Sequence, residues 1–332
     1  MLPKPDQPTG TPRIFVFLLL DGFAMMSLTC AIEPLRSLNR LVGREIFAWR
    51  LARVGDGPVH ASNGLPIEAQ PALEALAGAE VLFMCSGLRT DVDNEKAYHA
   101  VLRKAAHLGI SLGALSTGGY MLARAGLLDG YRCTLHWENR MAFKQAFPHI
   151  DCTDKLYEID RNRLTCSGGI ASMDLMLRLI SDAYGPELAQ RVAHQFHHDR
   201  IRAGEEEQRG GRADLQNNLP PLLRAALRLM EDRLDDPLEI PSIAAQMNVS
   251  LRHLERVFHQ HLGTSPVRYY ISIRVAHARE LLLYSDRSVL DIAVATGFSS
   301  TSHFSHWFKQ AYAYRPTEFR KTLPARWSPA QR

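Results

Sequence analysis

The sequence predicts a chain of two parts, an α/β domain with a parallel sheet followed by an all-α domain. Apolar, strand-like runs alternate with helix-like segments through the first part, an order that produces a sheet flanked by helices in a flavodoxin-like sandwich. Residues 202–218 then contain almost no apolar side chains, as a linker would. Beyond them, one pattern of two short helices occurs twice, with Phe258 and Phe308 separated by 50 residues.

Composition supports two domains of different character. The 332 residues are 46% hydrophobic and 22% charged, which is ordinary for a globular chain. Residues 219–332 carry 15 Lys and Arg against 10 Asp and Glu, whereas residues 1–218 carry 24 against 25. A positive second half beside a neutral first half suits a nucleic-acid-binding domain joined to a domain with another task.

Cysteine usage and hydropathy exclude several classes of protein. The five cysteines are scattered and lack CxxC spacing, so we expect neither a disulfide framework nor a metal site. The apolar run at 14–20 is too short to span a membrane and has no basic leader. We therefore expect a cytoplasmic protein with no membrane association.

The elements of the first domain, placed at 13–201, follow in chain order. The continuous apolar run 14–20 ends at Asp21-Gly22, which is typical of a buried parallel strand followed by a turn. The same reasoning gives further strands at 45–54, 81–85, 110–115 and 163–166. Helical periodicity predicts helices at 31–42, 94–108, 120–125 and 171–183, with helical residues continuing to about Arg202.

The second domain, placed at 219–323, reads as helical throughout. Its first helix has an apolar stripe of Leu222, Ala226, Leu229 and Met230. Shorter helices are predicted at 240–247, 250–261, 288–295 and 300–311. Pro266 opens a long helix to Leu283, and Pro316 opens the last helix, because proline suits the first turn.

The doubled pattern has the form of a helix-turn-helix unit, which places its second helix in the DNA major groove. Asn248 and Gly297 fill the matching turn positions, where a positive φ is often required. In the first copy Leu254, Val257 and Phe258 face inward, which leaves Arg252, His253, Glu255 and Arg256 for DNA. In the second copy Phe304, Trp307 and Phe308 are expected in the core, which leaves Ser302, His303, Ser305, His306 and Lys309.

Residues 219–323 resemble the DNA-binding domain of the AraC/XylS family, through the stretches DIAVATGFSSTSHFSHWFKQ and YRPTEFR. The resemblance implies two helix-turn-helix units bridged by the long helix and bound to two adjacent major grooves of double-stranded DNA. Arg252, Glu255 and Arg256 would enter one groove, and Thr301, Ser302, Ser305 and His306 the next. Ala313 stands where the family usually has glycine. Because arginine contacts bases more selectively than serine or histidine, we expect the first unit to dominate sequence discrimination.

The segment Ser116-Thr117-Gly118-Gly119 lies between a predicted strand and a predicted helix, where enzymes of the hydrolase type place a nucleophile. Read alone, it is an altered GxSxG elbow. A serine hydrolase would also need a histidine base and an acid, for which His136 and either Glu33 or Asp174 are available.

The first 200 residues resemble the ThiJ/PfpI domain of the glutamine-amidotransferase-like superfamily, and the whole chain resembles GlxA-type regulators. The matching stretches are FLLLDGF, AIEPLR, GALSTGGYMLARAGLLDG, TLHW and LTCSGGIASMDLMLRLI. Enzymatic relatives carry cysteine at the elbow and an acidic residue after the first strand, where this chain has Ser116 and Ser27. We therefore expect no catalytic residues and a ligand site in place of an active site.

The candidate ligand residues are Ser116, Thr117, Glu33, His136 and Trp137. Relatives of this kind regulate catabolism of amino acids and of betaine- or carnitine-like compounds. For such a zwitterion the elbow could hold the carboxylate, and Trp137 or Phe23 the ammonium group. Structural alternatives remain: Trp137 and His136 as core residues, and Glu33 as a favourable charge at a helix start.

The resulting expectation is a ligand-controlled transcription regulator, an activator and homodimer that works with RNA polymerase and needs no cofactor. One alternative is a serine-dependent amidase or esterase with an appended DNA-binding domain. Another is a structural DNA-binding protein without an effector.

Overall fold

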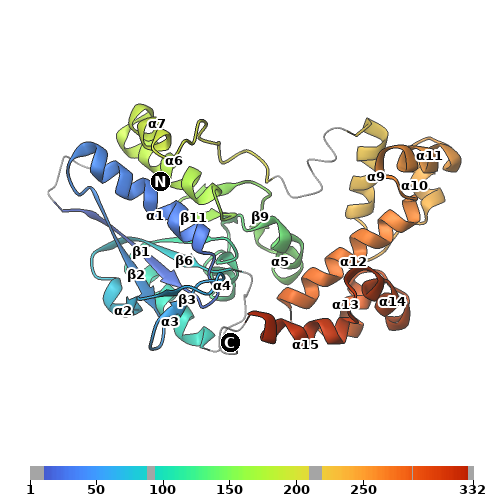
Figure 1. Ribbon diagram of the computed structural model, residues 1–332, viewed down its shortest axis with the longest axis horizontal. Helices are drawn as coiled ribbons and strands as arrows, with labels where there is room; N and C mark the ends of the chain where they lie inside the picture. The colour runs from blue at the N-terminus through green and yellow to red at the C-terminus, as the bar shows by residue number, and fades with distance from the viewer. Residues whose placement is uncertain (1–10, 88–93, 209–218, 286, 328–332) are drawn as a thin grey trace. The chain divides into compact units, whose positions relative to one another are not determined.

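The computed structural model describes residues 11–87, 94–208, 219–285 and 287–327. The chain divides into two compact units, the first ending at Gln208. The first unit holds a seven-stranded sheet with helices on both faces, and the second is helical (Figure 1). None of the helices within the described ranges is long and apolar enough to cross a membrane.

The central sheet confirms the predicted α/β class. Its strand order is β10-β11-β7-β6-β1-β2-β5, and every neighbouring pair is parallel except β10 with β11. The strands are β1 (Arg13–Leu19), β2 (Phe47–Arg53), β5 (Gln70–Pro71), β6 (Ala79–Cys85), β7 (Ser111–Leu115), β10 (Tyr157–Asp160) and β11 (Arg163–Cys166). Two small sheets pair β3 (Val59–His60) with β4 (Pro66–Ile67) and β8 (Arg132–Cys133) with β9 (Asp151–Cys152). All five predicted strands are present.

Two layers of helices cover the sheet, and alternate side chains of β1 supply the two cores. Phe15 and Phe17 pack in one cluster with residues of α1 (Met25–Val42), α6 (Ala171–Tyr184) and α7 (Pro186–His194). Val16 and Leu18 pack in the other cluster, on the side of α2 (Ala72–Ala75), α3 (Glu95–His107), α4 (Gly119–Arg124) and α5 (Arg140–Ala146) (Figure 1). Both faces are buried, which is why β1 is apolar at consecutive positions.

Two predicted helix boundaries in this unit were wrong. The helix expected from Ala31 begins at Met25, because the buried stripe of Leu28, Ala31 and Leu35 continues through Pro34. Proline there removes one backbone hydrogen bond, and packing outweighs that loss. The helical run expected to reach Arg202 is instead α6, a break at Gly185, and α7, which ends at His194.

The helical unit is built around one long helix, α12 (Pro266–Tyr284). Helices α9 (Pro221–Glu231), α10 (Ile240–Gln246) and α11 (Leu251–Leu262) share a core with Tyr270 and Ile273 of α12. Helices α13 (Val289–Ala295), α14 (Thr301–Tyr312) and α15 (Pro316–Trp327) pack against α12 as a second group. The two predicted helix-turn-helix units are therefore α10–α11 and α13–α14, bridged by α12.

Two details of the predicted helical core were wrong. The buried stripe of α9 is Leu223, Ala226, Leu227 and Met230, whereas Leu222 and Leu229 are only half-buried. Trp307 is also half-exposed, and its indole N–H donates to His303 Nε2 at 2.8 Å. The N–H has a polar partner at the surface, so the ring lies beside the buried pair Phe304 and Phe308 and not among them.

Candidate ligand and DNA-binding sites

Ser116 forms a strained elbow between β7 and α4. Its φ is 60°, a left-handed conformation that costs a non-glycine residue about 1–2 kcal/mol. The side chain is 8% exposed, and the Ser116 N–H donates to the Cys166 carbonyl oxygen at 3.0 Å. The neighbouring strand β11 thus holds the turn, and the Ser116 N–H is already bonded within the protein.

Ser27 of α1, at the position where the family resemblance implies an acid in enzymatic relatives, lies beside the elbow. Its Oγ accepts a hydrogen bond from the Gly169 N–H at 2.8 Å. A methyl group on Gly168 would come within 2.9 Å of both Ser27 Oγ and Ser116 Cβ, so α1, β7 and the turn before α6 meet tightly here. The residue that faces the elbow is therefore a neutral hydroxyl.

His136 and Trp137 lie on a segment that contacts the elbow through the backbone. The His136 N–H donates to the Ser116 carbonyl oxygen at 3.4 Å, and burial lowers the pKa of the His136 imidazole. Trp137 is 40% exposed, with its ring centroid 5.7 Å from that of His136. Trp137 is not a core residue and is open to solvent, whereas Phe23 is fully buried and cannot present its ring to a ligand.

Two other ligand candidates have polar partners within the protein. The Thr117 hydroxyl lies 2.8 Å from Ser86 Oγ and also donates to the Gly87 carbonyl oxygen. Glu33 lies in the middle of α1 and not at a helix start, and its carboxylate accepts from Arg36 Nη2 at 2.7 Å. The structure therefore brings Ser116, Ser27 and His136 together, while the Thr117 and Glu33 side chains are bonded elsewhere.

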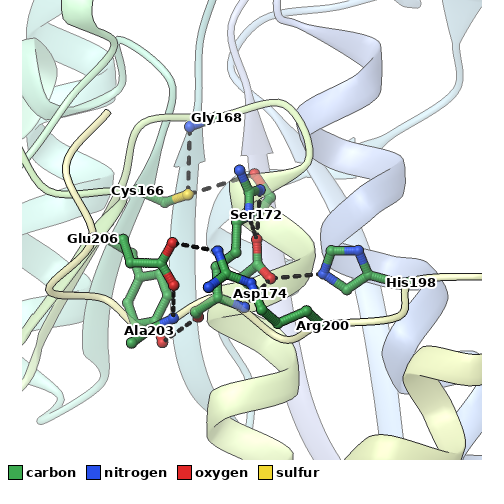
Figure 2. A network of polar contacts seen from close by, with 10 residues as sticks. Cys166, Gly168, Ser172, Asp174, His198, Arg200, Ala203 and Glu206 are labelled. Carbon is green, nitrogen blue, oxygen red and sulfur yellow. Dashed lines mark hydrogen bonds and ion pairs between the residues drawn. The ribbon is translucent and has the colours of Figure 1, made fainter. Parts of the chain in front are cut away.

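The carboxylate of Asp174, on α6, holds a segment that leads out of the unit. Asp174 is fully buried, and its Oδ1 accepts from His198 Nε2 at 2.8 Å and from the Arg202 N–H at 2.9 Å. Its Oδ2 accepts from Arg202 Nε at 2.9 Å and Nη2 at 2.6 Å. Figure 2 shows Asp174 directed at His198, so Asp174 does not form the pair with His136 that a serine hydrolase would need.

We call residues 198–208 the strap. Arg200 pairs with Glu206 at 2.6 Å (Figure 2), and the Leu156 N–H donates to the Glu206 carbonyl oxygen at 2.9 Å. At its end, Gln208 Nε2 donates to Thr134 Oγ1, Leu135 O and Lys155 O at 2.9–3.0 Å. Residues 202–208, the first part of the predicted linker, thus pack on the first unit, and residues 209–218 lie outside the described residues. A lone Asp in the apolar run SMDLMLRLI was the only sequence signal for this network.

The second helix of each helix-turn-helix unit presents the predicted polar face. Ser250 and Ser300 cap α11 and α14 by accepting from the N–H groups of His253 and His303. Arg252, Glu255 and Arg256 are exposed on α11, as are Ser302, His306 and Lys309 on α14, with Thr301 and Ser305 half-exposed. Arg256 Nη2 lies 2.9 Å from His253 Nδ1, so the half-buried His253 supports the guanidinium.

Comparison with known proteins agrees with this architecture. Residues 12–182 match the DJ-1/PfpI family, and residues 243–322 match a helix-turn-helix domain family. The HTH-type transcriptional regulator GbdR of Pseudomonas aeruginosa is 38% identical over 313 residues, covering 94% of this chain and 85% of GbdR. The HTH-type transcriptional regulator GlxA of Rhizobium meliloti is 38% identical over 306 residues, covering 92% of this chain and 94% of GlxA. The crystal structure of an AraC family transcriptional regulator from Pseudomonas putida, 32% identical, covers 56% of this chain and all of that chain, with a TM-score of 0.52.

A DJ-1/PfpI-type α/β unit joined to an AraC-type pair of helix-turn-helix units defines a class of DNA-binding transcription regulators. The chain belongs to the GlxA-type family of HTH-type transcriptional regulators.

Proposed function

We propose that a small zwitterionic metabolite, an amino acid or a betaine- or carnitine-like compound, binds at the Ser116 elbow and controls DNA binding, and that the elbow does not catalyse. The observation that carries this proposal is the serine pair. Ser116 keeps the strained geometry of a nucleophile position, while Ser27 supplies a neutral hydroxyl where catalysis would require an acid. A serine hydroxyl without an adjacent base is a weak nucleophile but a good hydrogen-bond partner.

The carboxylates considered as catalytic acids have other partners. Asp174 is bonded to His198 and Arg202, and Glu33 is paired with Arg36. His136 therefore has neither of them to orient its ring as a general base. This distribution favours ligand binding over the amidase or esterase alternative.

The residues around the elbow suit a zwitterion. The Ser116 hydroxyl can donate to a carboxylate, and the imidazole of His136 is kept neutral by burial, which lowers its pKa. Trp137 offers an exposed aromatic face, which attracts an ammonium group by cation–π contact.

The strap gives ligand binding a route to the helical unit. Gln208 Nε2 binds the carbonyl of Leu135, and the next residue, His136, binds the Ser116 carbonyl. Asp174, which holds Arg202, lies on the helix whose preceding turn binds Ser27. We infer that a ligand at the elbow changes how firmly the strap is held, and that the change passes along the chain to the DNA-binding unit.

The remaining functional assignments are proposals from the family resemblance and the charge pattern. We propose a cytoplasmic activator that acts with RNA polymerase as a homodimer. Its sensing domain would be 13–201 and its DNA-binding domain 219–323, with 202–218 connecting them. The excess of basic residues after residue 218 supports the DNA partner.

The test is calorimetric titration of the full chain with amino acids, betaine and carnitine. We expect at least one of them to bind the wild type and the Asp56→Trp control, whose side chain lies in an exposed loop, and to fail with Ser116→Trp. A bound ligand at 100 times its Kd should also raise the free energy of unfolding by about 2.7 kcal/mol. Unchanged affinity in Ser116→Trp would exclude the elbow as the site.

Two outcomes would favour the alternatives. Amidase or esterase turnover that disappears in Ser116→Ala would make the first unit an enzyme. DNA affinity that is the same with every compound in the panel would favour a DNA-binding protein without an effector.

A further inference from the structure

The second helix-turn-helix unit touches the segment that leads into the first unit, in addition to the bridge that α12 forms between the two units. The contact joins the segment between α9 and α10 to the turn between α13 and α14. It involves Leu234, Pro237, Tyr270, Arg274 and Gly297, which we call the joint. All five belong to the second compact unit of the chain.

Tyr270 fastens α12 to the first helix-turn-helix group. It is 3% exposed and packs in the core formed by α9, α10 and α11. Its hydroxyl donates to the Arg233 carbonyl oxygen at 2.6 Å, one residue before Leu234. The segment that meets the second unit is therefore held to α12 itself.

Arg274, one helical turn later, fastens α12 to the second group. Its Nε donates to the Thr296 carbonyl oxygen at 2.7 Å and its Nη2 to the Gly297 carbonyl oxygen at 2.5 Å. The guanidinium carbon lies 4.2 Å from the Phe298 ring centroid, and Arg274 is 9% exposed, so burial lowers the pKa of this guanidinium. A buried cation bound by two carbonyl oxygens and an aromatic face permits little movement of the turn.

Gly297 closes the joint, and comparison with Asn248 shows why glycine is required. Both residues occupy the turn position and have positive φ, 69° for Gly297 and 55° for Asn248. Asn248 is exposed, so its side chain meets no obstacle. A methyl group on Gly297 would lie 2.5 Å from Pro237 Cδ and 2.8 Å from the Leu234 carbonyl oxygen. The backbone conformation alone would accept asparagine, whereas the close approach does not.

We propose that the joint fixes the separation and relative rotation of α11 and α14. It thereby determines which spacing the regulator accepts between the two DNA boxes, the short base sequences that α11 and α14 each contact. Tyr270, Arg274 and Gly297 are positioning residues. They act on the recognition helices, α11 and α14, and do not themselves contact bases. Each inserted base pair moves the second box by about 3.4 Å along the duplex and rotates it, so a rigid pair of helices tolerates one spacing. Loosening the joint should broaden that tolerance.

The experiment uses the full chain and duplexes selected from a random library, which yields two boxes at a preferred separation. Affinity is then measured for that duplex and for versions with one base pair inserted or removed between the boxes. We expect the affinity of the wild type to fall about tenfold or more when the spacing is altered, by analogy with the cost of a mismatched base pair. The affinity of Gly297→Asn should fall less than about threefold on the same change of spacing, and this variant should still select the same base sequences in the two boxes.

Matched variants separate positioning from folding. Asn248→Gly exchanges the same two residue types at the exposed turn and should keep the wild-type spacing ratio, as should Arg268→Gln at an exposed site on α12. Adding Pro237→Ala to Gly297→Asn should partly restore the wild-type ratio of affinities for the preferred and altered spacings. The second change removes the proline atoms nearest the new side chain. If Gly297→Asn does not fold, Tyr270→Phe, which only deletes a hydroxyl, takes its place. A wild-type spacing ratio in the folded joint variant would overturn the proposal.

Discussion

At the scale of single residues, the two recognition helices end in the same backbone conformation with different residue types. Gly263 closes α11 with a φ of 65°, and Ala313 closes α14 with a φ of 64°. The N–H of each donates to the carbonyl oxygen four residues earlier. Alanine carries a steric penalty in this conformation that glycine lacks, so the second helix ends under mild strain.

Replacing Ala313 with glycine should therefore stabilise the helical unit. The expected gain is about 0.5–1 kcal/mol, which is the relief of left-handed strain less the added entropy of glycine in the unfolded chain. Gly263→Ala should lower stability by a similar amount. Scanning calorimetry of the full chain measures both effects. A loss of stability in Ala313→Gly would show that Ala313 is not strained in its left-handed conformation.

His136 makes the stability of the first unit depend on pH. Burial lowers the pKa of His136 below its usual value of 6.5, so the folded state binds fewer protons than the unfolded state in the interval between the two pKa values. Stability should thus fall as the pH drops through about 6.5 towards the lower folded value. Burial also lowers the pKa of His99, in the same direction.

Urea denaturation across a pH series tests this effect. His136→Asn should flatten the loss of stability on acidification without abolishing it, because His99 remains. If the free energy of unfolding falls with decreasing pH as steeply in His136→Asn as in the wild type, the folded protein does not disfavour the charged form of His136.

At the scale of elements, the strap is an irregular segment whose first residues are held by one helix, α6. Asp174 of α6 accepts four hydrogen bonds from His198 and Arg202, whereas Asp182 of the same helix forms only a partly exposed pair with Arg178. A fully buried carboxylate that loses its charge leaves its partners without compensation.

Asp174→Asn should lower the free energy of unfolding by about 2–3 kcal/mol, reduced from the usual buried-pair value because Arg202 is partly exposed. It should also speed hydrogen exchange in residues 198–208 and weaken the response of DNA binding to the effector. The control Asp182→Asn should change stability by less than about 0.5 kcal/mol and leave exchange unaltered. Slow exchange retained in Asp174→Asn would show that the strap is held by other contacts.

At the scale of the whole molecule, the two helices predicted to enter the major grooves, α11 and α14, are unequal. Arginine can form two hydrogen bonds with guanine, and α11 exposes Arg252 and Arg256. Helix α14 offers serine, threonine and histidine at the corresponding face, with Lys309 for phosphate. Sequence discrimination should thus rest mainly on the first unit.

Competition binding with matched and mismatched duplexes checks this division. Arg256→Ala should reduce discrimination by about 1–3 kcal/mol, and His306→Ala should reduce it less. A larger loss of discrimination in His306→Ala would reverse the assignment of the two units.

Local chemistry determined much of this protein directly from its sequence. The apolar strand runs, the serine caps, the prolines that open α12 and α15, and the left-handed turns at Asn248 and Gly297 each depend on neighbouring residues. The duplicated unit and the exposed arginines of α11 follow from periodicity, so the fold class and the DNA-binding role were predictable.

Tertiary structure alone decided which polar groups meet. Asp174 pairs with Arg202 and not with His136, and Gly297 meets Pro237 from another helix pair. The start of α1 and the exposure of Trp307 were also set by packing. Contacts between residues far apart in the chain depend on how whole elements pack, and periodicity along one segment carries no record of its distant partners.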